Sequence, residues 1–521
     1  MKVECIEFSE TGQFAPIFND FVEQKEVLKT FYHRFPLIEN FKDQIKEKAG
    51  HPVNREVLVQ SLKNQYQSIP NLSEKFVSKI ESLQSVKTFT VTTGHQLNIF
   101  SGPLYFHFKI ITVINACRSL KKAYPDYNFV PVYWMASEDH DLEEIKTVQV
   151  EGKKYKWPTT QTGAVGKMKT EGLGKLADQI EKVNGLFHQA YNKAGNLAEA
   201  VRYYVHELYG KEGLVVLDGD DSGLKKYLIP AIKEDVVNNT ANSLVEKQSA
   251  KLEESGYKSQ TFPREINFFY LQDGIRCRIV KAESGYKVLD TDIQFSEKEI
   301  LDEIDSNPQN FSPNVILRPL YQEIILPNLA YTGGPAEVAY WMQLKLVFKH
   351  FDVPFPILLP RNFGMIIPNK IQHKIKKLKL SNVQLFKEKE KLKKTIIKKI
   401  SAQKLNLNEE RQQLLQLMEE IQQYAEDIDL SLAEMASAET QKIRNAIDKI
   451  EKKMLAAEKR KHSDKMRQID EITDYLFPGS GLQERKENFL PFYKSDPAFI
   501  DKLLKSFDPF NLKFHILRWD G

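Results

Sequence analysis

Four clusters of polar residues have the types and spacing needed for chemistry on a small molecule. The first lies in the string Thr93-Gly94-His95-Gln96-Leu97-Asn98-Ile99-Phe100-Ser101-Gly102-Pro103. A β-rich run, a glycine turn and a helix start would leave free backbone N–H groups and an imidazole at a strand end, which suits a phosphate or a carboxylate. The alternative is a loop whose glycines only satisfy turn geometry. The candidate binding residues here are Gly94, His95, Gln96 and Gly102.

The second cluster, Glu138-Asp139-His140-Asp141, directly follows the apolar run 130–135. Imidazole and carboxylates are metal ligands. Adjacent residues of an extended segment point to opposite faces, however, so all four cannot bind one ion. We therefore predict no resident metal and expect one or two of these side chains to recognise a sugar or an amine, while the rest cap the next helix.

The third cluster, Asp218-Gly219-Asp220-Asp221, follows the apolar run 214–217. Asp218 and Asp220 could hold a ribose, an amino group or Mg²⁺. Asp-Gly is also common turn chemistry, so both interpretations stay open.

The fourth cluster combines Arg318 with the string Tyr331-Thr332-Gly333-Gly334-Pro335-Ala336-Glu337. Gly333 and Gly334 would let backbone N–H groups approach an anion, and the following Pro suits the first turn of a helix reaching about residue 349. Arg318 offers a planar fork for a carboxylate or phosphate. Glu337 falls in the first helical turn, where it either favours the helix dipole or binds an amine.

Short apolar runs separated by helical patterns must position these clusters, and they predict an α/β fold with a parallel sheet covered on both faces. The runs are 89–93, 129–135, 214–217, 315–317 and 356–359, with a helix expected at about 104–122. Ligands of such sheets gather at the carboxyl ends of the strands, where the clusters lie. Arg361 follows the last run and is either a fifth binding residue or a core anchor.

Two segments look like insertions into this sheet. Residues 266–270 and 275–280 are β-rich and flank Asp273-Gly274, which predicts a hairpin. Residues 153–174 are rich in turn formers. We place inserted modules at about 151–175 and 258–295.

Residues 371–470 contain neither Pro nor Gly, which predicts a helical arm. Two series of apolar residues have coiled-coil spacing, Ile443-Ile447-Ile450-Met454-Ala457 and Leu414-Ile421-Ile428-Met435. The pairs Asn406 with Glu409 and Ser431 with Glu434 resemble capping boxes, so we expect two or three helices. The arm would fold back on itself or pair with another chain.

Composition excludes several classes of protein. The formal charge is only +4 and 41% of residues are hydrophobic, so the chain is neither disordered nor basic throughout. Residues 371–400 hold 11 Lys against 2 Glu, which fits a solvated helix face better than nucleic-acid binding. Three Cys and no long apolar run favour a soluble cytoplasmic protein without membrane association. The sequence lacks a P-loop, Gly-x-Gly-x-x-Gly and Gly-x-Ser-x-Gly.

Three strings resemble the cysteine ligase family of bacillithiol biosynthesis, the BshC family, and the resemblance covers the whole chain. They are Thr93–Gln96 with Phe100–Tyr105, Pro131–Asp141, and Arg318–Glu323 with Tyr331–Glu337. The family usually has Gln at the position of His95. This sequence also has neither the His-x-Gly-His motif nor the Lys-Met-Ser-Lys-Ser loop of related nucleotidyl-transfer enzymes.

The resemblance implies a Rossmann-like core with inserted connecting modules, a coiled-coil arm and a homodimer formed through that arm. The domains would be 1–369 (core), 370–474 (arm) and 475–521 (a segment packing back on the core). The implied activity is a carbon–nitrogen ligase that joins cysteine to the amine of glucosaminyl-malate, which completes bacillithiol. Fold kinship suggests ATP or another adenine nucleotide, with Mg²⁺ as a further candidate cofactor. The alternative is a nucleotide-binding head on a coiled-coil scaffold without turnover.

Under the ligase interpretation, Gly94, Gln96 and Gly102 would line a phosphate or acyl site. Asp139, His140 and Asp141 would orient and deprotonate the amine, with His140 the best base by its ordinary pKa. Arg318 and the Gly333-Gly334 helix start would hold a malate carboxylate. The other expected binding residues are His95, Glu138, Asp218, Asp220, Glu337 and Arg361.

Overall fold

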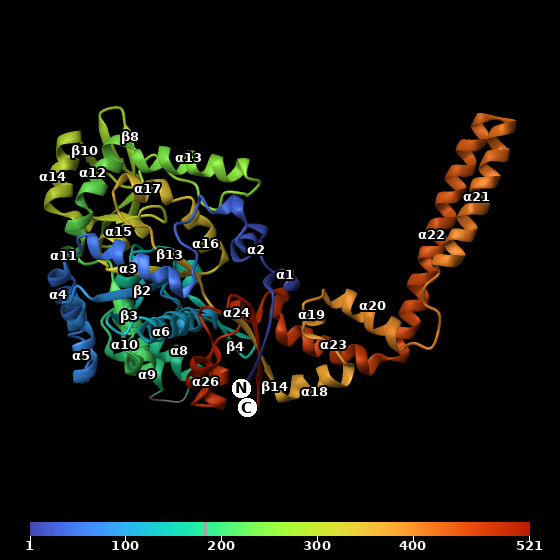
Figure 1. Cartoon of the computed structure of the whole chain (residues 1–521), viewed down its shortest axis with the longest axis horizontal. Coiled ribbons are helices and arrows are strands. Elements are labelled where there is room, and N and C mark those ends of the chain that lie inside the picture. The colour runs from blue at the N-terminus through green and yellow to red at the C-terminus, as the bar shows by residue number, and fades with distance from the viewer. Residues whose placement is uncertain (182–184, 521) are drawn as a thin grey trace. The chain divides into compact units, whose positions relative to one another are not determined.

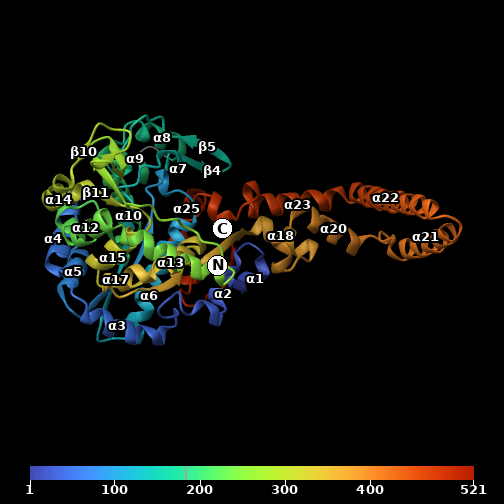
Figure 2. The same ribbon diagram turned by 90° about the horizontal axis from the view of Figure 1, so that it is seen from above.

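The chain divides into two compact units in the computed structural model, which describes residues 1–181 and 185–520 (Figure 1, Figure 2). The first unit comprises residues 1–365 and 483–517, and the second comprises 366–482 and 518–520. The expected C-terminal segment, 475–521, is therefore divided, with residues 483–517 in the first unit. Within the described residues, no helix combines the length and apolar character needed to cross a membrane.

A five-stranded parallel sheet forms the centre of the first unit, in the order β13-β12-β2-β3-β6. Its strands are β2 (Thr88–His95), β3 (Asn128–Met135), β6 (Val215–Asp218), β12 (Asn328–Gly333) and β13 (Ile357–Pro360). Nearly every residue of these strands is buried, as a sheet covered on both faces requires. The predicted α/β class is confirmed, and four of the five predicted apolar runs belong to this sheet.

The helices that support the sheet ends are close to their predicted positions. The expected helix 104–122 is α6 (Tyr105–Ala123), which packs on β2 and β3. The expected helix 335–349 is two helices, α16 (Pro335–Met342) and α17 (Lys345–His350). The break falls at Gln343, whose buried side chain accepts hydrogen bonds from the N–H groups of residues 260 and 261.

For the central sheet, one predicted strand is wrong and one strand was not predicted. Residues 315–317 form no strand, because they lead into α15 (Arg318–Ile325), where Pro319 occupies the first turn of the helix. The missed strand is β12, whose buried Asn328 accepts hydrogen bonds from the hydroxyls of Thr90 and Thr92. Asn328 conceals a core strand, because partners outside the strand, Thr90, Thr92 and Glu323, satisfy its buried side chain.

The predicted hairpin at 266–280 is confirmed as part of an antiparallel sheet in the order β10-β9-β8-β7-β11. These strands are β7 (Phe268–Gln272), β8 (Ile275–Ala282), β9 (Gly285–Val288), β10 (Gln294–Phe295) and β11 (Phe311–Pro313). Gly274 has a φ of 71°, which only glycine adopts without strain in this turn. The other expected insertion begins with the hairpin of β4 (Thr147–Val150) and β5 (Lys153–Lys156).

The remaining helices of the first unit surround these sheets. They are α1 (Phe8–Thr11), α2 (Pro16–Val22), α3 (Phe41–Gly50), α4 (Arg55–Gln65), α5 (Glu74–Glu81), α7 (Leu142–Ile145), α8 (Leu173–Ile180), α9 (Leu186–Lys193), α10 (Leu197–Tyr209), α11 (Ser222–Lys225), α12 (Ile229–Asn238), α13 (Thr240–Glu254), α14 (Glu297–Ser306), α24 (Gln483–Lys486), α25 (Leu490–Ser495) and α26 (Phe499–Ser506). The strand β1 (Lys2–Ile6) begins the chain, and the boundary between the units falls inside β14 (Phe363–Pro368) and β15 (Phe514–Trp519).

The helical arm is confirmed, but it has more helices than the two or three expected. They are α18 (Asn369–Leu378), α19 (Asn382–Leu385), α20 (Lys389–Ile400), α21 (Asn408–Ile428), α22 (Leu430–Lys461) and α23 (Ser463–Leu476). Neither predicted capping box forms. Asn406 accepts a hydrogen bond from the N–H of Asn408, and Asp429 rather than Ser431 caps α22. Short polar side chains at neighbouring positions compete for the same cap, so spacing alone identified the wrong residue.

Helices α21 and α22 lie side by side as a helical hairpin, so the arm folds back on itself (Figure 1). The reversal at Asp429 interrupts the seven-residue series, which places Met435 on the second helix. In the other series Ile447 is buried, whereas Ile450 is 52% exposed. The face of α22 that contains Ile447 therefore packs against α21, whereas the face that contains Ile450 is exposed to solvent.

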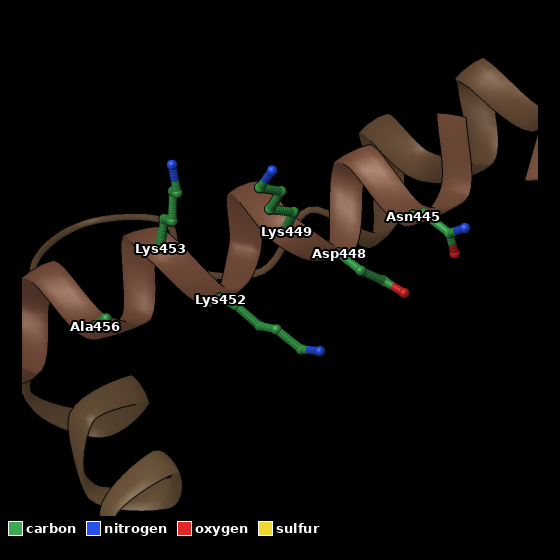
Figure 3. Close-up of a pocket in the computed structure, with 6 residues that line it drawn as sticks. All are labelled: Asn445, Asp448, Lys449, Lys452, Lys453 and Ala456. Carbon is green, nitrogen blue, oxygen red and sulfur yellow. The ribbon is translucent and has the colours of Figure 1, made fainter. Parts of the chain in front are cut away.

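Many lysines of the arm pair with carboxylates of α23 or α22. Lys389 and Lys393 contact Asp470, and Lys374 pairs with Glu471. A depression of about 410 Å³ on α22 is lined by residues of that helix alone, and Figure 3 shows Asp448 and Lys452 projecting to one side and Lys449 and Lys453 to another. A single helix face without an opposing wall is a solvated surface rather than a binding site.

Candidate active site

A cavity of about 530 Å³ opens at the carboxyl ends of β2, β3 and β12. The chain reaches β12 only after building β3 and β6 on the opposite side of β2, so the strand order reverses between β2 and β12. Ligands of open parallel sheets bind at such a reversal. The predicted residues that line the cavity are Gly94, His95, Gln96, Glu138, Asp139, His140, Asp141, Arg318 and Glu337.

A buried lysine and a carboxylate form an ion pair at the base of the cavity. Lys109, on α6, is 3% exposed, and its Nζ lies 2.6 Å from Glu337 Oε2 and donates to the carbonyl oxygen of Gly94 at 2.8 Å. Burial lowers the pKa of Lys109, and Glu337 opposes this effect. Burial would likewise raise the pKa of Glu337, but Lys109 and the N–H of Gly334 outweigh it and hold the pKa below its usual value. The two charges cancel.

Arg318, the first residue of α15, adds a positive charge beside this neutral pair, and no carboxylate of the described residues forms an ion pair with it. Its guanidinium lies over the rings of Trp134 and Tyr331, with 5.7 Å and 5.5 Å to the ring centroids. Nη1 donates to Gln322 Oε1 at 3.1 Å, whereas Nη2 is buried and has no hydrogen-bond partner among the described residues. A buried donor without an acceptor is costly. The arrangement is therefore complementary to an anionic ligand such as a carboxylate.

Asp139, His140 and Asp141 line the same cavity and meet a residue of the antiparallel sheet. One donor atom from each of the three lies within 4.8 Å of the others. Arg276, on β8, places Nη1 2.6 Å from His140 Nδ1 and 3.7 Å from Asp139 Oδ1. Glu138 instead pairs with the buried Lys225. Because Arg276 already supplies a cation beside these donors, they do not fit a resident divalent metal.

The contact with Arg276 fixes how His140 can act. Arginine only donates hydrogen bonds, so His140 Nδ1 must be the acceptor and Nε2 carries the proton. Nε2 lies 4.0 Å from Asp141 Oδ1. Burial, followed by the charge of Asp139, raises the pKa of Asp141. In this geometry Asp141 offers the available basic atom, and the protonated Nε2 of His140 lies near it without a hydrogen bond.

Gln96 closes one side of the cavity. Its amide nitrogen donates to Asp139 Oδ2 at 3.0 Å and to Glu144 Oε2 at 2.9 Å. Beside it, His95 Nε2 lies 3.2 Å from the amide of Asn98. Burial, followed by the charge of Lys109, holds the pKa of His95 well below its ordinary value, so this imidazole is a neutral polar group.

Two family models match the chain over almost its full length. Residues 1–362 match the N-terminal Rossmann-like domain of bacillithiol biosynthesis BshC, and residues 364–519 match its C-terminal coiled-coil domain. This chain belongs to the BshC family. The predicted Rossmann-like core and coiled-coil arm are confirmed.

Relatives of the same family extend over the whole chain. A protein of Flavobacterium psychrophilum named "Putative cysteine ligase BshC" is 43% identical over 99% of this chain and 100% of its own length. Proteins of the same name from Flavobacterium johnsoniae and Cytophaga hutchinsonii are 41% and 39% identical, over 99% and 98% of this chain and 100% and 98% of their own lengths.

Six predicted residues of this BshC chain lie outside the cavity lining. Gly333 ends β12, and the Gly334 N–H donates to Glu337 Oε2 at 2.8 Å, so the helix start is already capped. Arg361 pairs with the buried Glu484 at 2.5 Å. Gly102 lines a neighbouring cavity.

The remaining two, Asp218 and Asp220, follow β6. The Asp218 carboxylate accepts from Ser137 and from the Asp220 N–H, and Asp220 pairs with Lys167. These contacts fix the loop after β6.

Sequence reasoning missed Lys109 and Arg276, two cations that line the cavity and contact its predicted carboxylates. Lys109 was detectable as the one basic side chain besides His107 in the largely apolar stretch 104–114. Arg276 lies on a strand of the inserted sheet between two half-buried residues, Ile275 and Cys277, and no local pattern distinguishes it from Arg278.

A buried histidine beneath the loop 98–103 predicts acid sensitivity. His107 is 1% exposed and bridges the hydroxyls of Ser101 and Tyr209 at 2.9 and 2.6 Å, and burial lowers its pKa to about 3. Between pH 6.5 and 3 the unfolded chain binds a proton that the folded chain does not. The free energy of unfolding should therefore fall, as pH decreases, by up to about 1.4 kcal/mol per pH unit from this residue.

Urea unfolding of the wild type and His107→Gln between pH 7 and pH 4.5 measures this slope. The variant should be less stable at pH 7 and show a shallower loss on acidification. Equal slopes would contradict a neutral buried His107.

Proposed function

We propose that this chain is a ligase that forms an amide between the carboxyl group of cysteine and the amine of glucosaminyl-malate, the last step of bacillithiol synthesis. The observation that carries the proposal is the lining of one cavity. Arg318 contributes a positive charge without a carboxylate partner, and Asp139, His140 and Asp141 form a second group in the same lining. A substrate with both carboxylates and an amine matches this distribution of charge. Membership of the BshC family supports the choice of cysteine ligation.

The proposed reaction assigns a role to each group. Malate carboxylates bind Arg318, with Lys109 as a second donor held by Glu337. Asp141 takes the proton of the amine, and Arg276 and Asp139 keep His140 and Gln96 in place. The neutral amine then bonds to the activated acyl carbon, the bond from that carbon to the phosphate oxygen breaks, and the phosphate-bearing group leaves. The nitrogen releases its second proton to solvent as the amide forms.

Activation of the cysteine carboxylate requires a nucleoside triphosphate. We propose that it is ATP, because the core of the chain is Rossmann-like. Adenylyl or phosphoryl transfer both yield an acyl phosphate with a phosphate-bearing leaving group. Mg²⁺, if used, would arrive with the nucleotide, since Asp139, His140 and Asp141 do not fit a resident ion beside Arg276. We also propose a cytoplasmic location, which the free thiols of Cys5, Cys117 and Cys277 support.

Thiol profiling of cells with and without the gene tests the proposal. Mass spectrometry should show that bacillithiol disappears and glucosaminyl-malate accumulates when the gene is deleted. Restoration by the wild-type gene is the control. An unchanged thiol profile would refute the ligase assignment.

We further propose that the arm forms a homodimer. Apolar side chains on the α21–α22 hairpin remain exposed even though the two helices already pack together, which leaves area for a second copy. These include Leu417, Ile421, Ile428 and Met435, which are 51%, 42%, 78% and 59% exposed.

Light scattering of the full chain should give the mass of a dimer. Replacing Leu417 and Ile421 by Glu should convert it to a monomer, because charges on the seam cannot be buried. The matched control places Glu at Gln412 and Gln423, exposed positions on a different face of the same helix. A monomeric wild type would exclude the proposed interface.

A further inference from the structure

A second cavity of about 310 Å³ adjoins the first and is built from three separate segments of the same unit. The loop 96–105 forms one wall, the β4–β5 hairpin forms another, and the end of α24 forms a third. Gln96 and Tyr105 line both cavities. A ligand in one cavity is therefore next to a ligand in the other.

The charge of this second cavity is positive. Lys154, Arg485 and Lys486 line it, together with a single carboxylate, Glu144. Glu144 already accepts from Gln96 and so is partly satisfied. No ion pair within the described residues neutralises any of the three cations, whereas many exposed lysines elsewhere in the chain have a carboxylate within reach.

The end of α24, which carries Arg485 and Lys486, is held in place by the residue before them, Glu484. Glu484 is fully buried, pairs with Arg361 at 2.5 Å and accepts from the Gly364 N–H at 2.9 Å. Arg361 also lies over the rings of Phe363 and Tyr105, at 3.9 and 5.2 Å from their centroids. Breaking the buried Arg361–Glu484 pair would be strongly destabilising. The pair therefore holds the next residues, Arg485 and Lys486, at the edge of the cavity.

The backbone of the wall formed by the loop 96–105 is also held in a fixed conformation. Phe100, Ser101 and Gly102 all have positive φ values of 52°, 62° and 64°, and Asn488 donates to the carbonyl oxygens of residues 100 and 102. A Cβ on Gly102 would lie 2.7 Å from that of Asn98. Strained backbone that is fixed from several sides is typical of functional sites.

We infer that this second cavity binds a phosphate-bearing anion, with Lys154, Arg485 and Lys486 as its charged contacts and Gln96 between it and the first cavity. The inference rests on the proposed function to the extent that the anion is the phosphate chain of the activating nucleotide. An acyl phosphate at Gln96 would then face the amine held beside Asp139, with its phosphates directed toward Arg485.

Calorimetric titration of the full-length protein with sodium pyrophosphate at fixed ionic strength tests the site without requiring turnover. Replacing both Arg485 and Lys486 by Gln should weaken binding at least about tenfold, since two charge-assisted contacts are lost. Lys154→Gln should weaken it less. The matched control replaces Lys258 and Lys298, exposed lysines outside both cavities, and should bind as the wild type does.

Further outcomes separate this inference from the proposed function. Arg318→Gln should leave pyrophosphate binding within about twofold of wild type, because Arg318 lines only the first cavity. Competition by ATP would assign the site to nucleotide phosphates, and binding of pyrophosphate without such competition would assign it to a free phosphate. Wild-type affinity in the Arg485/Lys486 variant, or no binding by the wild type, would overturn the inference even if the ligase activity were established.

Discussion

Replacing Arg318 by Gln is expected to lower kcat/KM for glucosaminyl-malate by about a hundredfold. The buried Nη2 of Arg318 has no partner among the described residues, so a substrate carboxylate would make its charge-assisted hydrogen bond there. Such a bond contributes up to about 3 kcal/mol. Glutamine retains polarity but loses both the charge and the fork geometry. Steady-state kinetics on purified protein measure the loss.

Two controls make this prediction specific. Arg264→Gln removes an exposed arginine that does not line the cavity and should leave kcat/KM unchanged. With methyl glucosaminide, which lacks the malate carboxylates, Arg318→Gln and wild type should differ by less than about threefold. Equal losses on both substrates would show that Arg318 supports the fold and does not bind malate.

The second large effect is expected at Asp141. Asp141→Asn should lower kcat at pH 7 by about a hundredfold or more, the usual contribution of a general base. The deficit should shrink above pH 8, because the substrate amine, with a pKa of about 8 by analogy with an α-amino group, is then already neutral. His140→Asn should cost only about tenfold, since Arg276 already occupies its basic nitrogen. pH–rate profiles of both variants measure this.

Arg276 provides the decisive comparison. If His140 were the base, Arg276→Gln would free Nδ1 and raise the rate, and His140→Asn would cost at least as much as Asp141→Asn. We expect the opposite, a rate loss in Arg276→Gln as the cluster loses its positive charge. Arg278→Gln, two residues along the same strand and exposed, is the matched control.

Local patterns in the sequence determined the classes of element. Continuous apolar runs such as 129–135 specify strands buried on both faces, and the absence of Pro and Gly from 371–470 specifies the arm. The clusters after these runs were located because carboxyl ends of parallel strands share one edge. Periodicity could not find β12, whose buried Asn328 is satisfied by side chains outside its own strand, those of Thr90, Thr92 and Glu323. It also misassigned residues 315–317, which are apolar but precede a helix start.

Only the tertiary structure decided which polar residues act together. Lys109 pairs with Glu337, Arg276 reaches His140, and Arg361 holds Glu484, and in each case the partners are far apart in the sequence. Charge at these positions depends on burial and on the neighbouring group, and neither is encoded in local spacing. Gly334 differs, because its N–H is taken by a local contact with Glu337, three residues along the chain, and the prediction of a ligand there overlooked this cap. The sequence therefore indicates where chemistry is located, and long-range packing determines which atoms remain available for it.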